Sequence, residues 1–156
     1  MKKTNAARFL DALNIAYELL EYPVDEDDLS AEDAANKLKV PTGQIFKTLV
    51  ARGDRTGVLT AIIPGRLELD LKTLAKLSGN KKVGMVPLTE VLSLTGYVRG
   101  AVSPLGMKKN YPYYLDQSAF NFADILISAG ARGVQIRLAP QDLVVTLGAV
   151  VGNISC

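Results

Sequence analysis

Apolar side chains recur along much of the chain at intervals of three or four residues, as on one face of a helix. Where such a stretch begins with a capping residue or a proline, the start of a helix is predicted. Ser30, for example, is followed three residues later by Asp33, which resembles a capping box. Five short helices are therefore expected, at residues 4–14, 30–38, 70–77, 87–94 and 140–147.

Other stretches are rich in β-branched and aromatic residues and are bounded by Gly, Pro or Asp, which is typical of strands. Residues 45–52 and 58–64 are two such stretches joined by G-D-R-T-G, which predicts a β-hairpin. The remaining strands are expected at residues 17–22, 82–86, 112–116, 123–128, 134–138 and 149–154.

Strands and helices alternate, but hairpins interrupt any regular βαβ repeat. This order favours an α/β or α+β fold, with a mixed and curled sheet surrounded by short helices. The 156 residues are enough for one core without disulfides, so a single domain over residues 1–156 is expected.

Composition supports a globular protein, with 48% hydrophobic and 22% charged residues. No stretch approaches about 18 uninterrupted apolar residues, so neither a signal peptide nor a membrane span is expected. The single cysteine, Cys156, is the last residue, which suits a reducing compartment. The expected location is the cytoplasm.

The chain contains no histidine, which excludes Ser-His and Cys-His catalytic pairs and most catalytic zinc sites. We therefore expect no metal and no cofactor. Any chemistry must use lysine, carboxylate, hydroxyl or backbone groups, or the substrate itself. The net charge of +2 is too small for strong binding of nucleic acid by bulk electrostatics, so an RNA substrate would need local contacts or a partner.

Four separated motifs carry a resemblance to a known family. In chain order they are F-K-T-L-V at 46–50, T-G-Y-V-R-G-A-V-S-P-L-G-M-K-K at 95–109, S-A-G-A-R-G at 128–133 and A-P-Q-D-L at 139–143. In this order they resemble the YbaK/EbsC family of free-standing Cys-tRNA(Pro) deacylases, which are related to the editing domain inserted in bacterial prolyl-tRNA synthetases. The resemblance extends over residues 6–152 and implies a barrel-like mixed sheet with helices packed outside.

Lys47 lies inside a predicted strand, where alternation places it on one face with Leu49 and places Phe46, Thr48 and Val50 on the other. On its own, an exposed edge lysine is the more common explanation. The matched motif instead implies a pocket, with Phe46 and Thr48 as neighbouring substrate-binding residues. Lys47 would there contact a phosphate or ribose oxygen, or help to hold the aminoacyl group.

The segment from Gly100 to Gly106 is the expected carbonyl-binding loop, because free N–H groups around a tight turn can stabilise a developing oxyanion. The resemblance places Gly100 at the substrate ester and implies that Ser103 and Pro104 bind substrate. Ala101 stands where many relatives have a second glycine, and its methyl group is expected to narrow the pocket. A purely structural turn is the alternative.

Three further residues are candidates for substrate binding. Tyr22 could stack on the terminal adenine or bind the ribose, or serve only as packing at the rim. The Ser128 hydroxyl could contact the substrate amine or thiol, or stabilise a local turn. Asp142 could bind the substrate ammonium, or complement the N-terminus of the last helix.

Exposed basic side chains could guide the acceptor end of tRNA, with solvated surface charge as an equal alternative. They are Lys81, Lys82, Lys108, Lys109 and Arg132.

The resemblance implies a trans-editing deacylase that removes cysteine from mischarged Cys-tRNA(Pro), with the substrate thiol attacking its own carbonyl and releasing a cyclic thiolactone. The implied partners are the acceptor end of aminoacyl-tRNA and, in trans, prolyl-tRNA synthetase. Two alternatives stay open. One is an Ala-tRNA(Pro) deacylase that uses water, and the other is a non-catalytic module that binds an aminoacyl group or a nucleotide.

Overall fold

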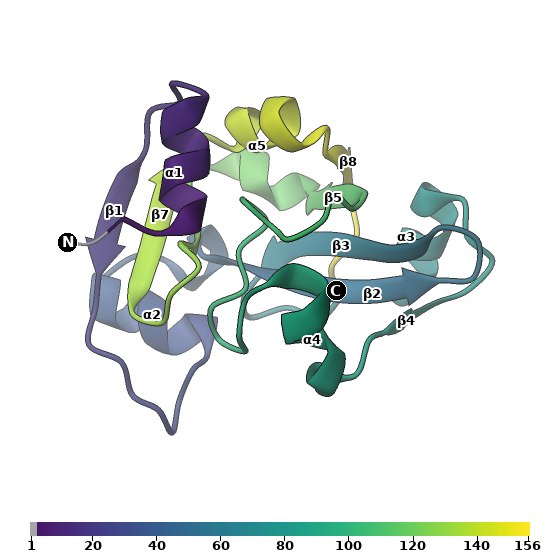
Figure 1. The fold of residues 1–156 in the computed structure, drawn as a ribbon, viewed down its shortest axis with the longest axis horizontal. Coiled ribbons are helices and arrows are strands. Elements are labelled where there is room, and N and C mark those ends of the chain that lie inside the picture. Colours follow the sequence, from purple (N-terminus) through teal and green to yellow (C-terminus); the bar gives the residue numbers. More distant parts are fainter. Residues whose placement is uncertain (1–2) are drawn as a thin grey trace.

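The computed structural model describes residues 3–156 and contains, within that range, two β-sheets with helices around them (Figure 1). The helices are α1 (Asn5–Ala12), α2 (Ala31–Leu38), α3 (Leu71–Ser78), α4 (Leu88–Thr95) and α5 (Pro140–Leu147). The strands are β1 (Glu18–Glu21), β2 (Phe46–Gly53), β3 (Gly57–Pro64), β4 (Val83–Met85), β5 (Tyr113–Asp116), β6 (Ile125–Ser128), β7 (Val134–Leu138) and β8 (Val150–Gly152).

The smaller sheet has the strand order β1-β7-β6 and is antiparallel throughout. The larger sheet has the order β4-β2-β3-β5-β8 and is mixed, with parallel pairing of β3 with β5 and of β5 with β8. Its centre is the expected hairpin of β2 and β3, in which Lys47 lies opposite Ile63.

The two sheets meet where Ile45, just before β2, forms an isolated parallel bridge to Leu126 of β6. The mixed α/β class is confirmed, and the barrel-like description needs one correction, because the strands form two separate sheets that do not close. A single bridge, rather than a ladder, joins them.

Side-chain caps explain where three of the helices begin. Thr4, Ser30 and Asp70 accept hydrogen bonds from the backbone N–H groups of Ala7, Asp33 and Thr73 at the starts of α1, α2 and α3. The helices α4 and α5 begin instead at or just after a proline, as expected.

The core of the molecule lies between the two sheets. Ile62 and Leu115 of the larger sheet share one buried apolar cluster with Ile127 and Ile136 of the smaller sheet. Helices α1 and α5 lie along this cluster, while α3 and α4 flank the hairpin (Figure 1). No helix in the described part of the chain is long and apolar enough to span a membrane.

All of the expected helices and strands are present, though several are shorter than predicted. The first helix ends at Ala12, and Asn14 takes a positive φ of 57° in the connection to β1. The terminal strand is reduced to β8, and Ser155 instead bridges Leu69. Two 3₁₀ turns, Thr42–Gln44 and Gln117–Asn121, were not predicted, because neither has an apolar period of its own.

Candidate active site

A cavity of about 320 Å³ lies beside the first half of β2. Its wall is formed by Phe46–Val50, the start of α2, the residues Met85–Val86 with α4, the loop around Gly100, and the ends of β6 and β7. Its volume falls at the lower end of the range for small-ligand sites, which leaves room for more than one amino-acid side chain.

Strand β2 alternates as expected. Phe46, Thr48 and Val50 are at most 8% exposed, while Lys47 and Leu49 are half-buried. Lys47 lines the cavity, and within residues 3–156 its side chain has no ion pair or hydrogen bond. A lysine in this setting keeps its three N–H donors available for an anionic or carbonyl group in the cavity.

Two buried polar atoms of the cavity wall lack a hydrogen-bond partner among residues 3–156. They are Oγ1 of Thr48 and Oε1 of Gln135, whose residues are 8% and 7% exposed. Buried polar groups are nearly always paired, so two unpaired oxygens in the wall of one cavity need an explanation. A ligand that donates hydrogen bonds would supply it.

The loop after α4 presents backbone donors at the other side of the cavity. The N–H of Ala101 is used within the turn, since it donates to the carbonyl of Val98 at 2.9 Å. The N–H groups of Gly100 and Val102 have no partner among the described residues, and both residues line the cavity. These two groups, rather than that of Ala101, are therefore the candidate oxyanion donors.

Gly100 is required at its position for two reasons. Its φ is +81°, and an added Cβ would lie 3.2 Å from Leu29, whose side chain packs against it. Ala101, in contrast, is buried and absent from the cavity lining. The expectation that its methyl group narrows the pocket was wrong, because that side chain points into the protein.

Two other residues of this loop also lie outside the cavity lining. Ser103 is fully buried, and its hydroxyl accepts a hydrogen bond from the N–H of Leu105 at 3.3 Å. Pro104 is buried next to it. Both shape the turn that holds Gly100, and neither is placed to touch a ligand in the cavity.

The remaining sequence candidates also divide into residues that line the cavity and residues that do not. Tyr22 and Ser128 line the cavity, although the Ser128 hydroxyl also accepts the N–H of Gly130 at 3.1 Å, as in the turn-stabilising alternative. Asp142 lies in the first turn of α5 and is not among the lining residues. Its interpretation as the ligand of a substrate ammonium is therefore not supported by its position, and the helix N-terminus accounts for it.

Among the expected basic residues, Arg132 lies beside the mouth, where its Nε donates to the carbonyl of Arg99 at 3.0 Å. Arg99 itself lines the cavity and is exposed. Lys81, Lys82, Lys108 and Lys109 are exposed and do not line it.

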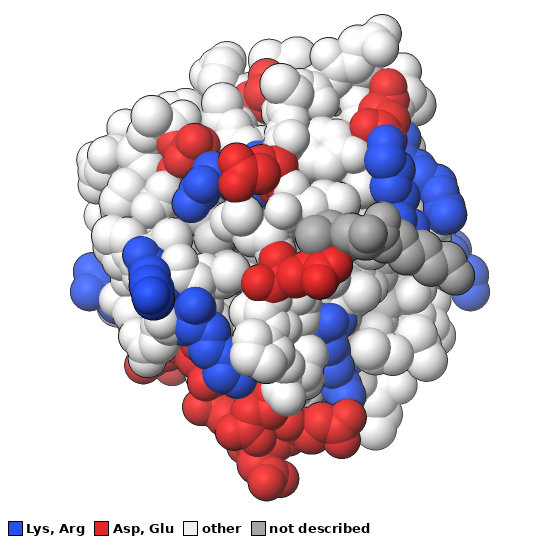
Figure 2. Space-filling model, turned by 90° about the vertical axis from the view of Figure 1, so that its left-hand side faces the viewer, with Lys and Arg blue, Asp and Glu red and all other residues white. Residues whose placement is uncertain are grey.

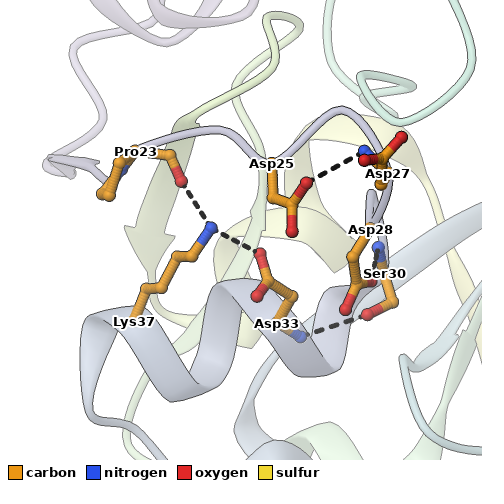
Figure 3. Close-up of polar contacts among 7 residues, drawn as sticks. All are labelled: Pro23, Asp25, Asp27, Asp28, Ser30, Asp33 and Lys37. Carbon is orange, nitrogen blue, oxygen red and sulfur yellow. Dashed lines mark hydrogen bonds and ion pairs between the residues drawn. The ribbon is translucent and has the colours of Figure 1, made fainter.

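The loop between β1 and α2 is acidic, and its side chains are held by local polar contacts (Figure 3). Its last residues, Leu29 and Ser30, line the cavity. Asp25 and Asp28 accept the backbone N–H groups of Asp27 and Ser30, at 3.0 and 3.1 Å. Hydrogen bonds from the side chain and backbone of Ser30 hold the pKa of Asp28 below its usual range. Lys37 braces the loop by donating to the carbonyl of Pro23 at 2.7 Å.

Sequence reasoning missed Gln135, Arg99 and Val102 as cavity residues. Gln135 gave no local signal, because it occupies a regular polar position in the alternating strand V-Q-I-R-L. Val102 lies inside the expected carbonyl-binding segment Gly100–Gly106, although it was not singled out there as the residue with a free N–H. Within residues 3–156 no cluster of His, Cys, Asp and Glu could hold a metal ion.

Comparison with known proteins adds an independent line of evidence. A model of the aminoacyl-tRNA editing domain matches residues 25–145. An Enterococcus faecalis protein named "Putative Cys-tRNA(Pro)/Cys-tRNA(Cys) deacylase EbsC" is 50% identical over 142 residues, which cover 91% of this chain and 87% of that protein. A proline–tRNA ligase of Sulfurihydrogenibium sp. is 35% identical over 106 residues, covering 68% of this chain and 18% of the ligase.

A solved structure with a similar fold also has a description related to tRNA editing. A crystal structure described as "a putative trans-editing enzyme for prolyl tRNA synthetase" superimposes with a TM-score of 0.84 at 27% identity, covering 100% of this chain and 99% of that one.

Proposed function

Because this chain belongs to the aminoacyl-tRNA editing domain family, we propose that its cavity is the site at which cysteine is removed from mischarged Cys-tRNA(Pro). The observation that carries the proposal is the set of groups without a protein partner on residues that line one cavity. Thr48 and Gln135 present acceptors, while Gly100 and Val102 present backbone donors. An aminoacyl ester offers a matching α-ammonium donor and a carbonyl acceptor.

The acceptors are assigned to the substrate ammonium. An ammonium has three donors and no acceptor, so two of its N–H groups can pair with the Thr48 hydroxyl oxygen and the side-chain Oε1 of Gln135 and satisfy both of these buried acceptors. Hydrogen bonds to a charged group contribute roughly 1.5–3 kcal/mol each. This fixes the amino acid by its backbone and leaves its side chain free to react.

The backbone donors are assigned to the ester carbonyl. As the carbonyl carbon becomes tetrahedral, negative charge develops on its oxygen, and the N–H groups of Gly100 and Val102 stabilise it. Lys47, with its ammonium unpaired in the same cavity, binds a phosphate or ribose oxygen of the terminal nucleotide. Tyr22 at the rim stacks on the terminal base.

The nucleophile is the thiol of the substrate cysteine. Its sulfur attacks the ester carbonyl, a C–S bond forms, and the C–O bond to the ribose breaks. The thiol proton ends on the ribose oxygen, so the products are free tRNA and a cyclic thiolactone. The protein then has to supply only orientation and polarisation, which agrees with a chain that has no histidine.

Prolyl-tRNA synthetase is the proposed partner in trans. A pocket built for proline discriminates weakly against small amino acids, so the synthetase needs a separate corrective site. The match to part of a proline–tRNA ligase supports this association.

The test is deacylation of Cys-tRNA(Pro) and Ala-tRNA(Pro) in parallel, with the native protein and Lys47→Ala. Loss of cysteine alone, slowed at least about tenfold by the substitution, is expected. Loss of alanine instead would assign the protein to water-dependent editing. If neither ester is cleaved, even with the synthetase present, the function is that of a binding module.

A further inference from the structure

Charge is unevenly distributed over this molecule. Residues 18–33 hold eight of the 16 Asp and Glu side chains and no Lys or Arg, so all 18 basic side chains lie in the rest of the chain. Figure 2 shows carboxylates gathered at the lower end of one face, where Figure 1 places the loop between β1 and α2. The net charge of +2 is therefore the sum of an acidic segment, residues 18–33, and a basic remainder of the chain.

The acidic part borders the cavity on one side. Leu29 and Ser30, at the end of the acidic loop, line the cavity, and Asp25 and Asp28 line a small hollow just outside its mouth. Both carboxylates are held in place by hydrogen bonds to backbone N–H groups. A phosphodiester backbone crossing this side would meet fixed negative charge and be repelled.

A basic surface lies at the other end of β2. We define the basic tip as Arg55, Lys81 and Lys82, which are exposed and have no ion pair within residues 3–156. Buried Asn80 accepts the N–H of Arg55 at 2.8 Å. Asp54 accepts the N–H groups of Lys81 and Lys82, at 2.9 and 3.1 Å.

These bonds bring side chains that are 26 residues apart in sequence, at Arg55 and Lys81, to one place in the fold. Helix α3 adds two exposed lysines, Lys72 and Lys76, and residues 71–82 contain no carboxylate. In Figure 1 the hairpin turn, α3 and β4 lie together at the end of the molecule opposite β1.

The separation between the cavity and the basic tip matches the geometry of a tRNA end. From Val50, in the cavity wall, to Gly53 at the end of β2 is three residues, or about 10 Å at roughly 3.3 Å per residue, and Arg55 follows in the turn. Three stacked nucleotides span about 10 Å at roughly 3.4 Å each. A strand whose last nucleotide occupies the cavity therefore brings the first phosphates of the duplex stem to the basic tip.

We propose that the acceptor stem of the tRNA lies along the β2–β3 hairpin and is held at its phosphates by Arg55, Lys81 and Lys82, while the acidic segment 18–33 excludes it from the opposite side of the mouth. The proposal rests on the proposed function for the identity of the RNA. The contacts are to phosphates, so they position the stem without reading its sequence.

The experiment compares the triple variant R55Q/K81Q/K82Q with a control, K3Q/R8Q/K39Q, that removes the same formal charge near α1 and α2. Each protein is assayed with full-length Cys-tRNA(Pro) and with a cysteinylated trinucleotide of the same 3′ sequence. Binding of uncharged tRNA is measured in parallel from low to moderate salt. Circular dichroism checks that each variant is folded.

For the tip variant, kcat/KM on full-length tRNA should fall about tenfold or more at low salt, and the log–log salt dependence of binding should become shallower by about 2. Activity on the trinucleotide should not change, and the control should behave as the native protein. Unchanged activity of the tip variant on full-length tRNA, or an equal loss in the control, would overturn the proposal and leave the function standing. If the native protein cleaves neither ester, the function fails, and the binding measurement still decides the role of the basic tip.

Discussion

Thr48 and Gln135 each carry a buried polar atom that disfavours folding when it is unpaired but can bind a ligand. Each has a buried side-chain oxygen with no partner among residues 3–156, and such a group costs stability unless water or a ligand pairs with it. Such groups persist where a ligand satisfies them. The neighbouring Thr60 provides a contrast, because it is equally buried but donates its hydroxyl to the carbonyl of Pro112 at 3.0 Å.

We expect Thr48→Val and Gln135→Met to leave the free energy of unfolding unchanged or to raise it by up to about 1 kcal/mol. Both should lower kcat/KM for the aminoacyl ester about tenfold or more, because a bond to the substrate ammonium is lost. Thr60→Val is the matched control. It should lower stability by about 1 kcal/mol with activity retained. Urea unfolding and deacylation rates measure the two effects, and a loss of stability without loss of activity at Thr48 and Gln135 would contradict the assignment.

The hairpin of β2 and β3 depends on a side chain outside it. Asn80, which is 7% exposed, accepts the N–H groups of Arg55 and Thr56 and donates to Thr56 Oγ1 and Ser78 Oγ. Its amide lies so close to Gly53 that a Cβ there would be 2.3 Å away. The turn is therefore locked by packing of Asn80 against the glycine as well as by its four hydrogen bonds.

Asn80→Ala should destabilise the protein by about 2–3 kcal/mol, because two backbone donors of the turn lose their acceptor. Ser78→Ala, which removes one of the four bonds, should have a clearly smaller effect. Equilibrium unfolding in urea compares them. Equal effects of the two substitutions would mean that the turn is held by its own backbone.

The limits of sequence reasoning are visible at this same scale. The β2 and β3 strands were predicted correctly because alternation and glycine-bounded turns are local signals, and Ser30 and Asp70 are caps as expected. The role of Asn80 was not predictable, since 24 residues separate it from Thr56. The division into two sheets likewise depends on the long-range contact of Ile45 with Leu126.

The candidate site was predicted in part for related reasons. Lys47, Gly100 and Ser128 line one cavity, in agreement with the motifs that contain them, and Tyr22, which lies in none of these motifs, lines it too. The inward orientation of Ala101, by contrast, depends on a backbone turn that the sequence does not specify. Their roles with substrate stay predictions.

For the molecule as a whole, the absence of histidine makes stability insensitive to pH near neutrality. Backbone N–H groups, chiefly that of Lys82, lower the pKa of Asp54, and that of Thr73 lowers the pKa of Asp70. A lowered pKa in the folded state contributes stability above the ordinary value near 4, and this stability is lost as pH falls through the folded value. At the alkaline end, burial raises the pKa of Tyr113 to about 12.

The melting temperature should therefore be flat between about pH 5 and pH 9. It should fall below about pH 4, as the capping carboxylates take up protons, and above about pH 10, as the unfolded state gains stability by ionising its tyrosines. Asp54→Asn and Asp70→Asn should reduce the fall in melting temperature at low pH. Tyr113→Phe should reduce the fall at high pH. A change in melting temperature with its midpoint between about pH 6 and pH 7 would contradict this assignment of the titrating groups.

The central claim is that the cavity orients a cysteinyl ester so that the substrate supplies its own nucleophile. Its most direct test is single-turnover deacylation of Cys-tRNA(Pro) against Ser-tRNA(Pro), which differ only by sulfur and oxygen. We predict that the cysteinyl ester is cleaved at least about a hundredfold faster, because the hydroxyl is a far weaker nucleophile at neutral pH. Equal rates on the two esters would mean that water attacks, and the substrate thiol would then not be the nucleophile.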